Sequence, residues 1–167
     1  FDEVDDRLSK KLSNVIFNGP QEELTLTENA QPAIMAVSMA VIQVLKKDFK
    51  INIENKINFF AGHSLGEYTA LAAAGCLKLA DVTKILYFRG KNMQSSTHKL
   101  KTAMAAFVGA DINKIKDISK RSKSENSICD IANYNTANQI VLSGDEVAID
   151  KAIDLADNMN IKAFRLD

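Results

Sequence analysis

The stretch Gly62-His63-Ser64-Leu65-Gly66-Glu67 places a glycine two residues before and two residues after a serine. An apolar run, residues 57–61, precedes this stretch, and a helical pattern, residues 68–74, follows it. Strand, tight turn and helix in this order are the layout of a nucleophile elbow, which holds a serine hydroxyl where a base and an electrophile can both reach it. Because such a turn is sharp, we expect both glycine positions to tolerate little beyond glycine.

The elbow layout assigns roles to the residues of the turn. We expect Ser64 to be the nucleophile and the backbone N–H of Leu65, at the start of the helix, to bind a developing oxyanion. His63 is adjacent to the serine on a tight turn, so we interpret it as a supporting residue and not as the general base. The alternative is a glycine-rich strand-to-helix turn with a surface serine, since the bare G-x-S-x-G pattern also occurs by chance.

The composition narrows the class of protein. The chain has 167 residues, 46% of them hydrophobic, which is enough for one or two compact units. Its 21 basic and 21 acidic residues give no argument for nucleic-acid binding. The sequence shows no apolar run of about 18 residues and no signal-peptide pattern, so we expect a cytoplasmic protein that does not bind membranes. Cys76 and Cys129 lack metal-ligand spacing and are interpreted as reduced core thiols.

The first hundred residues are expected to form helices around one strand. Apolar spacing predicts helices over residues 1–18, where Gly19-Pro20 ends the first, 33–49, 68–74 and 82–94, and a strand over residues 57–61. Pro32 suits the first turn of the second helix, whose apolar circumference predicts burial, and Asp81 is predicted to cap the last helix. Residues 21–27 and 95–101 are expected to be polar connections.

From residue 103 the pattern changes to β-α-β-β-α-β, the order of a ferredoxin-like unit. Strands are predicted over residues 103–109, 128–133, 139–143 and 161–166, and helices from residue 112 and over residues 147–159. Asp111 is expected to cap the first of these helices, and an Asn-rich loop to join the two middle strands. We therefore predict two domains: residues 1–102, part of a large α/β domain, and residues 103–167, a small ferredoxin-like α+β subdomain.

The full string Gly-His-Ser-Leu-Gly-Glu-Tyr, residues 62–68, resembles the active-serine motif of malonyl-CoA:acyl carrier protein transacylases and of the acyltransferase domains of fatty acid and polyketide synthases. Members of that family similarly have a ferredoxin-like subdomain inserted after the active-serine region, which matches the order predicted here from residue 103. The resemblance implies an α/β-hydrolase-like acyltransferase that moves a malonyl group from malonyl-CoA to the phosphopantetheine thiol of acyl carrier protein, through an acyl-serine, in fatty acid biosynthesis. It implies no metal or redox cofactor, and we expect a monomer whose partners are malonyl-CoA and acyl carrier protein.

Two further segments resemble the family. Arg89 lies in an Arg-Gly-Lys-x-Met-Gln segment, which implies that its guanidinium grips the malonyl carboxylate, although a solvated arginine on a helix face is the commoner case. Residues 133–139 resemble the family's Asn-x-Asn segment, which implies that Asn133, Asn135 and Gln139 line the acyl and pantetheine channel. Asn-rich turns are also common for local backbone reasons.

The family's general base lies downstream of the ferredoxin-like unit, and its second oxyanion donor lies in an N-terminal Gly-Gln-Gly segment. Neither is found in these residues, so the resemblance implies a central fragment that is inactive alone. His98, the other histidine, is a disfavoured candidate for the base. The alternatives are an acyltransferase domain of a polyketide synthase, a serine acyl hydrolase, and a fragment that only docks carrier protein. Arg89 speaks against the hydrolase, because a neutral ester offers a guanidinium no partner.

Overall fold

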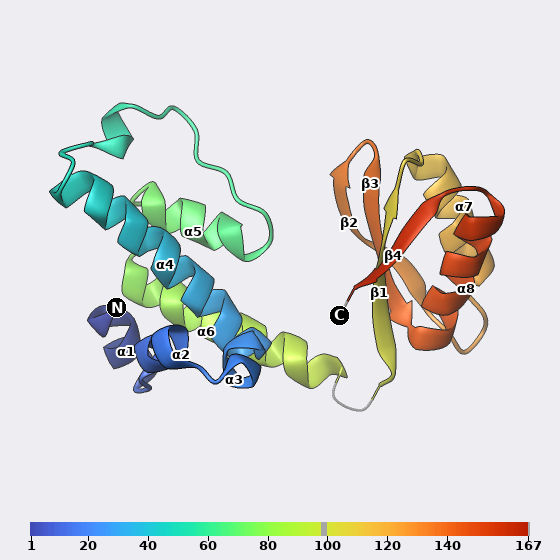
Figure 1. Cartoon of the computed structure of the whole chain (residues 1–167), viewed down its shortest axis with the longest axis horizontal. Coiled ribbons are helices and arrows are strands. Elements are labelled where there is room, and N and C mark those ends of the chain that lie inside the picture. Colours follow the sequence, from blue (N-terminus) through green and yellow to red (C-terminus); the bar gives the residue numbers. More distant parts are fainter. Residues whose placement is uncertain (98–99, 167) are drawn as a thin grey trace. The chain divides into compact units, whose positions relative to one another are not determined.

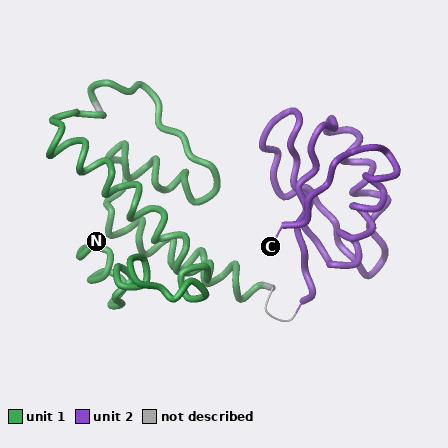
Figure 2. Tube along the Cα trace, in the orientation of Figure 1, with its two compact units in different colours: residues 1–98 green, residues 99–167 purple. Residues whose placement is uncertain are grey.

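The described strands are confined to the second part of the chain, whereas helices occur throughout it. The computed structural model describes residues 1–97 and 100–166, and within these residues every strand lies after residue 100 (Figure 1). The chain divides into two units, residues 1–98 and residues 99–167 (Figure 2), each with its own core of buried apolar side chains. Among the described residues, no helix combines the length and the apolar character that crossing a membrane requires.

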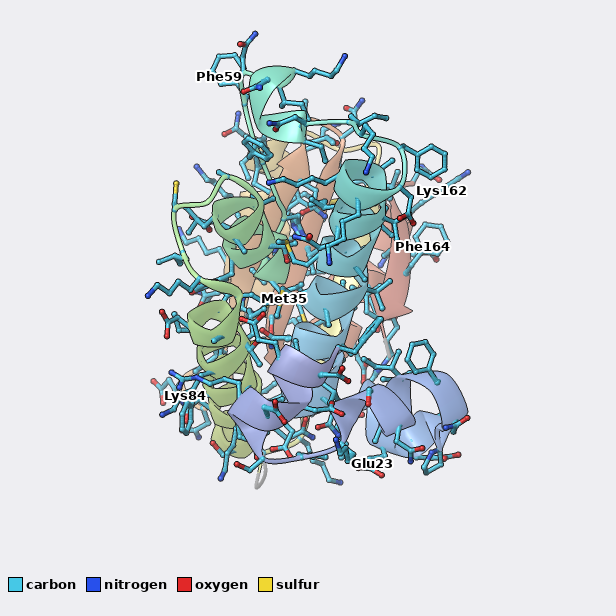
Figure 3. All side chains as sticks on the ribbon, turned by 90° about the vertical axis from the view of Figure 1, so that its left-hand side faces the viewer. Glu23, Met35, Phe59, Lys84, Lys162 and Phe164 are labelled. Atoms are coloured by element: carbon cyan, nitrogen blue, oxygen red, sulfur yellow. The ribbon has the colours of Figure 1, made fainter. Side chains whose placement is uncertain are left out.

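In the described residues of the first unit, all regular secondary structure is helical. Its elements are α1 (Asp2–Leu8), α2 (Leu12–Asn18), α3 (Gln21–Thr25), α4 (Thr27–Lys47), the 3-10 helix η1 (Ile53–Asn55), α5 (Leu65–Ala73) and α6 (Leu79–Thr97). Helix α4 packs against α2, α3, α5 and α6, and so forms the centre of the unit. Its Met35 is fully buried in the core, together with Leu12 and Leu86 (Figure 3).

The prediction of one helix over residues 1–18 is wrong, because the chain forms two helices with a bend between them. Ser9 takes the left-handed conformation, with φ 50°, and ends α1. The carboxylate of Asp5 accepts hydrogen bonds from the backbone N–H and the hydroxyl of Ser13, at 2.8 and 2.6 Å. These bonds satisfy an N–H in the first turn of α2, which local apolar spacing cannot reveal.

The predicted connection over residues 21–27 and the predicted start of the next helix are also wrong. Residues 21–25 form α3, and α4 begins at Thr27, so Pro32 lies inside α4 and not in its first turn. A proline inside a helix removes one backbone hydrogen bond. The helix continues nevertheless, because its side chains from Asn29 to Ala36 are largely buried and tertiary packing outweighs the local preference.

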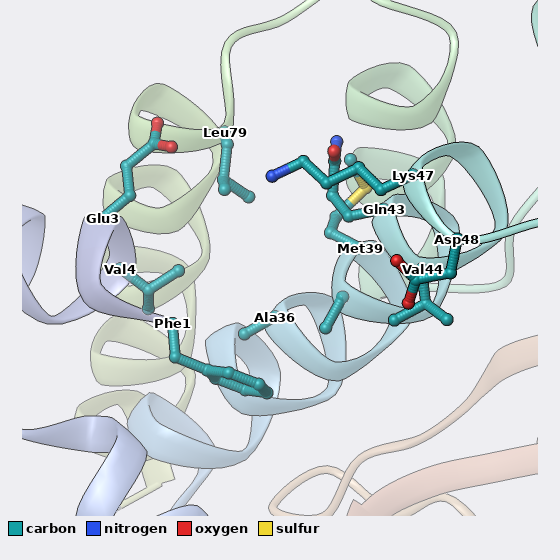
Figure 4. Close-up of a pocket in the computed structure, with 11 residues that line it drawn as sticks. Phe1, Glu3, Val4, Ala36, Met39, Gln43, Val44, Lys47, Asp48 and Leu79 are labelled. Carbon is teal, nitrogen blue, oxygen red and sulfur yellow. The ribbon is translucent and has the colours of Figure 1, made fainter. Parts of the chain in front are cut away.

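One side of α4 is exposed, which contradicts the prediction of a buried helix. Ile34, Val37, Val41 and Val44 are exposed, because the other helices of the unit cover only the opposite side. A pocket of about 460 Å³ also opens along this helix (Figure 4). Apolar side chains line much of it: Phe1 just before α1, Val4 of α1, Ala36 and Met39 of α4, and Leu79 of α6.

The predicted strand over residues 57–61 does not form. These residues follow an irregular path between η1 and α5 (Figure 1), and Phe59 is 88% exposed. A strand exists through hydrogen bonds to a neighbouring strand. The described part of the first unit contains no other strand, so the apolar run has nothing to pair with.

Helix α6 is longer at both ends than predicted. It begins at Leu79, so Asp81 lies in its first turn instead of capping it, and the Asp81 carboxylate accepts a hydrogen bond from Arg7 at 3.2 Å. At its other end α6 continues to Thr97, so much of the loop predicted over residues 95–101 is helical. Cys76, just before α6, is exposed, and its prediction as a core thiol is wrong; Cys129 is buried as predicted.

The second unit is a four-stranded sheet with two helices on one of its faces (Figure 1). Its elements are β1 (Thr102–Val108), α7 (Ile112–Ser122), β2 (Cys129–Thr136), β3 (Gln139–Asp145), α8 (Glu146–Asn158) and β4 (Lys162–Leu166). The strands lie in the order β2-β3-β1-β4 with antiparallel neighbours, and Phe107 lies opposite Ile140. Apolar side chains from one face of the sheet and from both helices form the core.

Two local predictions for this unit have opposite outcomes. The Asp111 cap of α7 is confirmed, because its carboxylate accepts from the N–H groups of Asn113 and Lys114, at 2.9 and 3.2 Å. The Asn-rich loop is wrong in its extent, because Asn135 belongs to β2, which runs on to Thr136. The hydrogen bonds that pair β2 with β3 outweigh the turn preference of asparagine.

Candidate active site

Ser64 lies at the N-terminal end of α5 in a backbone conformation that side chains with a Cβ rarely adopt. Its φ is 53° and its ψ is −115°. A conformation of this kind costs about 1–3 kcal/mol and persists only where the surrounding structure enforces it. The N–H of Gly66 donates to the carbonyl of His63 at 2.9 Å, and the N–H of Glu67 donates to the carbonyl of Ser64 at 3.2 Å. The turn therefore presents the serine at the helix end, where it is exposed.

The two glycines of the motif differ in what the fold requires. A Cβ on Gly62 would lie 1.9 Å from the carbonyl oxygen of Gly66, so only glycine fits at this crossing of the backbone. A Cβ on Gly66 would meet no described atom within 4 Å. The expectation that both positions demand glycine therefore holds for Gly62 and is wrong for Gly66 within the described residues.

Arg89 and Ser64, which are 25 positions apart in the sequence, are brought together by the packing of α5 and α6. Nη2 of Arg89 donates a hydrogen bond to Oγ of Ser64 at 3.1 Å. The guanidinium carbon also lies 5.9 Å from the centre of the Tyr68 ring, within the range of a cation–π contact. The Arg89 side chain is half-buried, so it is not the freely solvated arginine of the alternative interpretation.

Gln31 completes this site, and the sequence analysis missed it. It lies on α4, is only 4% exposed, and its Oε1 accepts from Nη1 of Arg89 at 2.5 Å. Its Nε2 donates to Sδ of Met93 at 3.4 Å. A glutamine directly before Pro32 and the apolar run over residues 33–37 was the available signal, because buried amides need hydrogen-bond partners. The partner could not be read from the sequence, since it lies 58 positions away.

Gly90 explains how Gln31 reaches Arg89. A Cβ on Gly90 would lie 2.3 Å from the carbonyl oxygen of Thr27 and 2.6 Å from Cα of Glu28. Helix α6 therefore approaches the backbone of the first turn of α4 directly beside Arg89. Such an approach is possible only without a side chain at this position.

The site combines an exposed hydroxyl with a fixed positive charge. A guanidinium keeps its charge at all physiological pH values and can hold a carboxylate through two parallel hydrogen bonds. The N–H of Leu65 begins α5, and N–H groups in the first turn of a helix carry partial positive charge. A reactive carbonyl at Ser64 with an anionic group beside it would therefore meet complementary charge on both sides.

The other predicted site residues lie as follows. Leu65 is the first residue of α5 and is half-buried, and His63 is exposed in the turn. Asn133, Asn135 and Gln139 lie in the second unit on β2 and β3, where Nδ2 of Asn135 donates to Oε1 of Gln139 at 3.1 Å. His98 lies outside the described residues. Within the described residues, no group of three or more His, Cys, Asp or Glu side chains is arranged to hold a metal ion.

Relatives in sequence and structure agree on one family. The chain is 42% identical over 158 residues to a malonyl CoA-acyl carrier protein transacylase of Bacillus subtilis, a match that covers 93% of this chain and 48% of that protein. It is similar in structure to an acyl-carrier-protein-S-malonyltransferase from Bartonella henselae, with a TM-score of 0.91, 47% identity, and coverage of 99% of this chain and 52% of the other.

A second similar structure is a malonyl-transacylase in complex with a type II PKS acyl-carrier protein, with a TM-score of 0.88 and 32% identity, covering 99% of this chain and 52% of that chain. The chain thus spans about half the length of the curated relatives it matches. The acyl transferase domain family matches residues 2–165. Because that match covers nearly all of the sequence, the chain belongs to the acyl transferase domain family.

Proposed function

We propose that the protein containing this chain transfers a malonyl group from malonyl-CoA to the phosphopantetheine thiol of acyl carrier protein, as a step of fatty acid biosynthesis. The hydrogen bond from Nη2 of Arg89 to Oγ of Ser64, at 3.1 Å, is the observation that carries the proposal. This bond places a permanent positive charge beside a hydroxyl that is positioned to act as a nucleophile. A positive charge at this point suits an acyl group that carries its own carboxylate. The names of the relatives support the same reaction.

The first half of the reaction forms an ester on Ser64. Oγ of Ser64 attacks the thioester carbonyl while a base accepts the hydroxyl proton, and the N–H of Leu65 stabilises the developing oxyanion. The C–S bond then breaks, and coenzyme A leaves as a thiol after taking up a proton. In the second half the thiol of the carrier attacks the ester, the C–O bond to Ser64 breaks, and the serine recovers its proton.

Arg89 changes partner during this cycle. Without substrate its Nη2 donates to the Ser64 hydroxyl. In the malonyl ester the free carboxylate takes this place, since it lies only a few bonds from Oγ and pairs more strongly with a guanidinium than a hydroxyl does. We assign Asn133, Asn135 and Gln139 to the channel for the acyl and pantetheine groups, and His63 to support of the turn.

The proposal includes the domain organisation. Residues 1–102 form part of the large α/β acyltransferase domain, and the turn at Ser64 acts as its nucleophile elbow. The left-handed φ of Ser64 and the close crossing at Gly62 support this assignment. Residues 103–167 form the ferredoxin-like subdomain, and the strand order β2-β3-β1-β4 supports that assignment.

Acylation of the full-length protein tests the function. With malonyl-CoA and no carrier, we expect a burst of coenzyme A release and a malonyl group on the peptide that contains Ser64, found by mass spectrometry. The Ser64→Ala variant should show neither, because removing the nucleophile removes the covalent route. Label on the alanine variant would show that Ser64 is not the nucleophile.

The same experiment separates the alternatives. Continued coenzyme A release without carrier would indicate a serine acyl hydrolase. Binding of carrier protein with no acylation of the wild type would indicate a docking module. Addition of carrier protein should transfer the malonyl group from Ser64 to the carrier thiol, which is the result that completes the proposed reaction.

A further inference from the structure

We infer that Gln31 is a positioning residue for Arg89, and that it sets the preference of the site for acyl groups that carry a carboxylate. This inference rests on the proposed function. It concerns a residue on α4 that touches neither Ser64 nor the reacting atoms and that acts through the guanidinium of Arg89.

Both ends of the Gln31 amide are engaged. Oε1 accepts from Arg89 and Nε2 donates to Met93, and both partners lie on α6, one helical turn apart. Reversing the amide would place its NH₂ group against the guanidinium, donor against donor, and would lose both contacts. Because the side chain is 4% exposed, water is poorly placed to replace either contact. The amide oxygen therefore has one stable direction, toward Arg89.

The contact with Gln31 fixes the orientation of the guanidinium. A guanidinium has five N–H donors in one plane, so the position of one nitrogen and the direction of the side chain determine where the others point. With Nη1 held by Gln31, Nη2 faces Oγ of Ser64. The Tyr68 ring, 5.9 Å from the guanidinium carbon, further limits its movement. Arg89 is thus oriented before a substrate arrives.

Glutamine also suits this position because it is neutral. A carboxylate in its place would pair with Arg89 and neutralise the charge that a substrate carboxylate needs. An apolar side chain of similar size would leave Nη1 without its acceptor and the guanidinium free to turn. An amide oxygen holds the arginine and leaves its positive charge and its remaining donors available for the substrate.

Two substitutions of similar size test this inference in the full-length protein. Gln31→Glu supplies a competing negative charge, and Gln31→Met removes the acceptor without adding a charge. Asn29→Asp is the matched control, because Asn29 is a buried amide on the same helix. Asn29 is 1% exposed, accepts from Nζ of Lys10 at 3.0 Å and donates to the carbonyl of Glu23 at 2.8 Å, and so holds other parts of the unit.

The measurement is the ratio of kcat/KM for malonyl-CoA to that for acetyl-CoA, with both thioesters competing in one mixture. The fraction of folded protein cancels from this ratio, so a purely structural role for Gln31 would leave it unchanged. We expect Gln31→Glu to lower the ratio by about tenfold or more, because the malonyl carboxylate would lose a hydrogen bond to the charged Arg89. Gln31→Met should lower the ratio less, chiefly through a higher KM for malonyl-CoA, and Asn29→Asp should leave it within about twofold of the wild type.

The outcomes separate this inference from the proposed function. A wild type that is not malonylated on Ser64 would overturn the proposed function and the inference with it. A malonylated wild type whose ratio survives in Gln31→Glu and in Gln31→Met would overturn the inference alone. An equal fall of the ratio in Asn29→Asp would also overturn it, because the effect would then not depend on the contact between Gln31 and Arg89.

Discussion

Replacement of Gly90 by alanine should destabilise the helical unit, although the same change stabilises most helices. In an exposed helix interior, Gly→Ala gains about 1 kcal/mol of stability from helix propensity. At Gly90 the new Cβ would lie 2.3 Å from the carbonyl oxygen of Thr27 and 2.6 Å from Cα of Glu28. Both are backbone atoms, so no side-chain rotation relieves the overlap and α6 must move away from α4.

Overpacking of this kind costs about 1–3 kcal/mol, and a clash with backbone belongs at the upper end of that range. After subtraction of the propensity gain, we expect Gly90→Ala to lose about 2 kcal/mol of unfolding free energy. Gly66→Ala is the matched control, because its Cβ meets no described atom within 4 Å, and it should gain up to about 1 kcal/mol.

Urea unfolding followed by circular dichroism at 222 nm measures both variants, since the chain has no tryptophan and the described part of the first unit is helical. The sign of the difference is the test. If Gly90→Ala were as stable as Gly66→Ala, the two helices would not approach each other as closely at Gly90 as described. The same displacement should also weaken the Gln31–Arg89 contact, so Gly90→Ala should bind malonyl-CoA more weakly in the full-length protein.

Three further outcomes are expected. Arg89→Ala should lower kcat/KM for malonyl-CoA by about 10–100-fold, the range for a lost hydrogen bond to a charged group, and should lower kcat/KM for acetyl-CoA less. Equal losses for both substrates, or a similar effect of the surface variant Arg7→Ala, would show that the role of Arg89 is structural. The backbone N–H of Lys114 lowers the pKa of Asp111, so its stabilisation is present above the unfolded pKa of 3.8 and is lost as the pH falls through the lower folded value. The difference in melting temperature between the wild type and Asp111→Asn should therefore narrow below about pH 4, and a constant difference would contradict the cap. A thiol reagent should label exposed Cys76 quickly and Cys129 only with denaturant, because burial raises the pKa of the Cys129 thiol; equally fast labelling would contradict its burial.

Features that depend on neighbours in the chain could be predicted from the sequence. The Asp111 cap needs only the N–H groups two and three residues further on. The β-α-β-β-α-β order from residue 103 follows from local alternation and apolar spacing, and the described strands and helices have this order. The crossing at Gly62 likewise involves Gly66, four positions away in the same short motif.

Features that depend on distant residues could not be predicted in this way. Residues 57–61 have the composition of a strand, but a strand needs a partner, and the described part of the first unit contains none. The apolar circumference of α4 predicted burial, but its neighbours cover only one side. In each case the local pattern describes what a segment can do, and its surroundings decide whether it does so.

The candidate site divides along the same line. The motif around Ser64 and the segment around Arg89 could be singled out from the sequence, because each is a short run of residues that resembles a motif of the acyltransferase family. Only the tertiary structure brings Arg89 to 3.1 Å from Ser64 and places Gln31 behind it. The physical reason is the approach of α6 to α4 at Gly90, where a missing side chain lets two helices meet and a buried amide finds its partner 58 positions away.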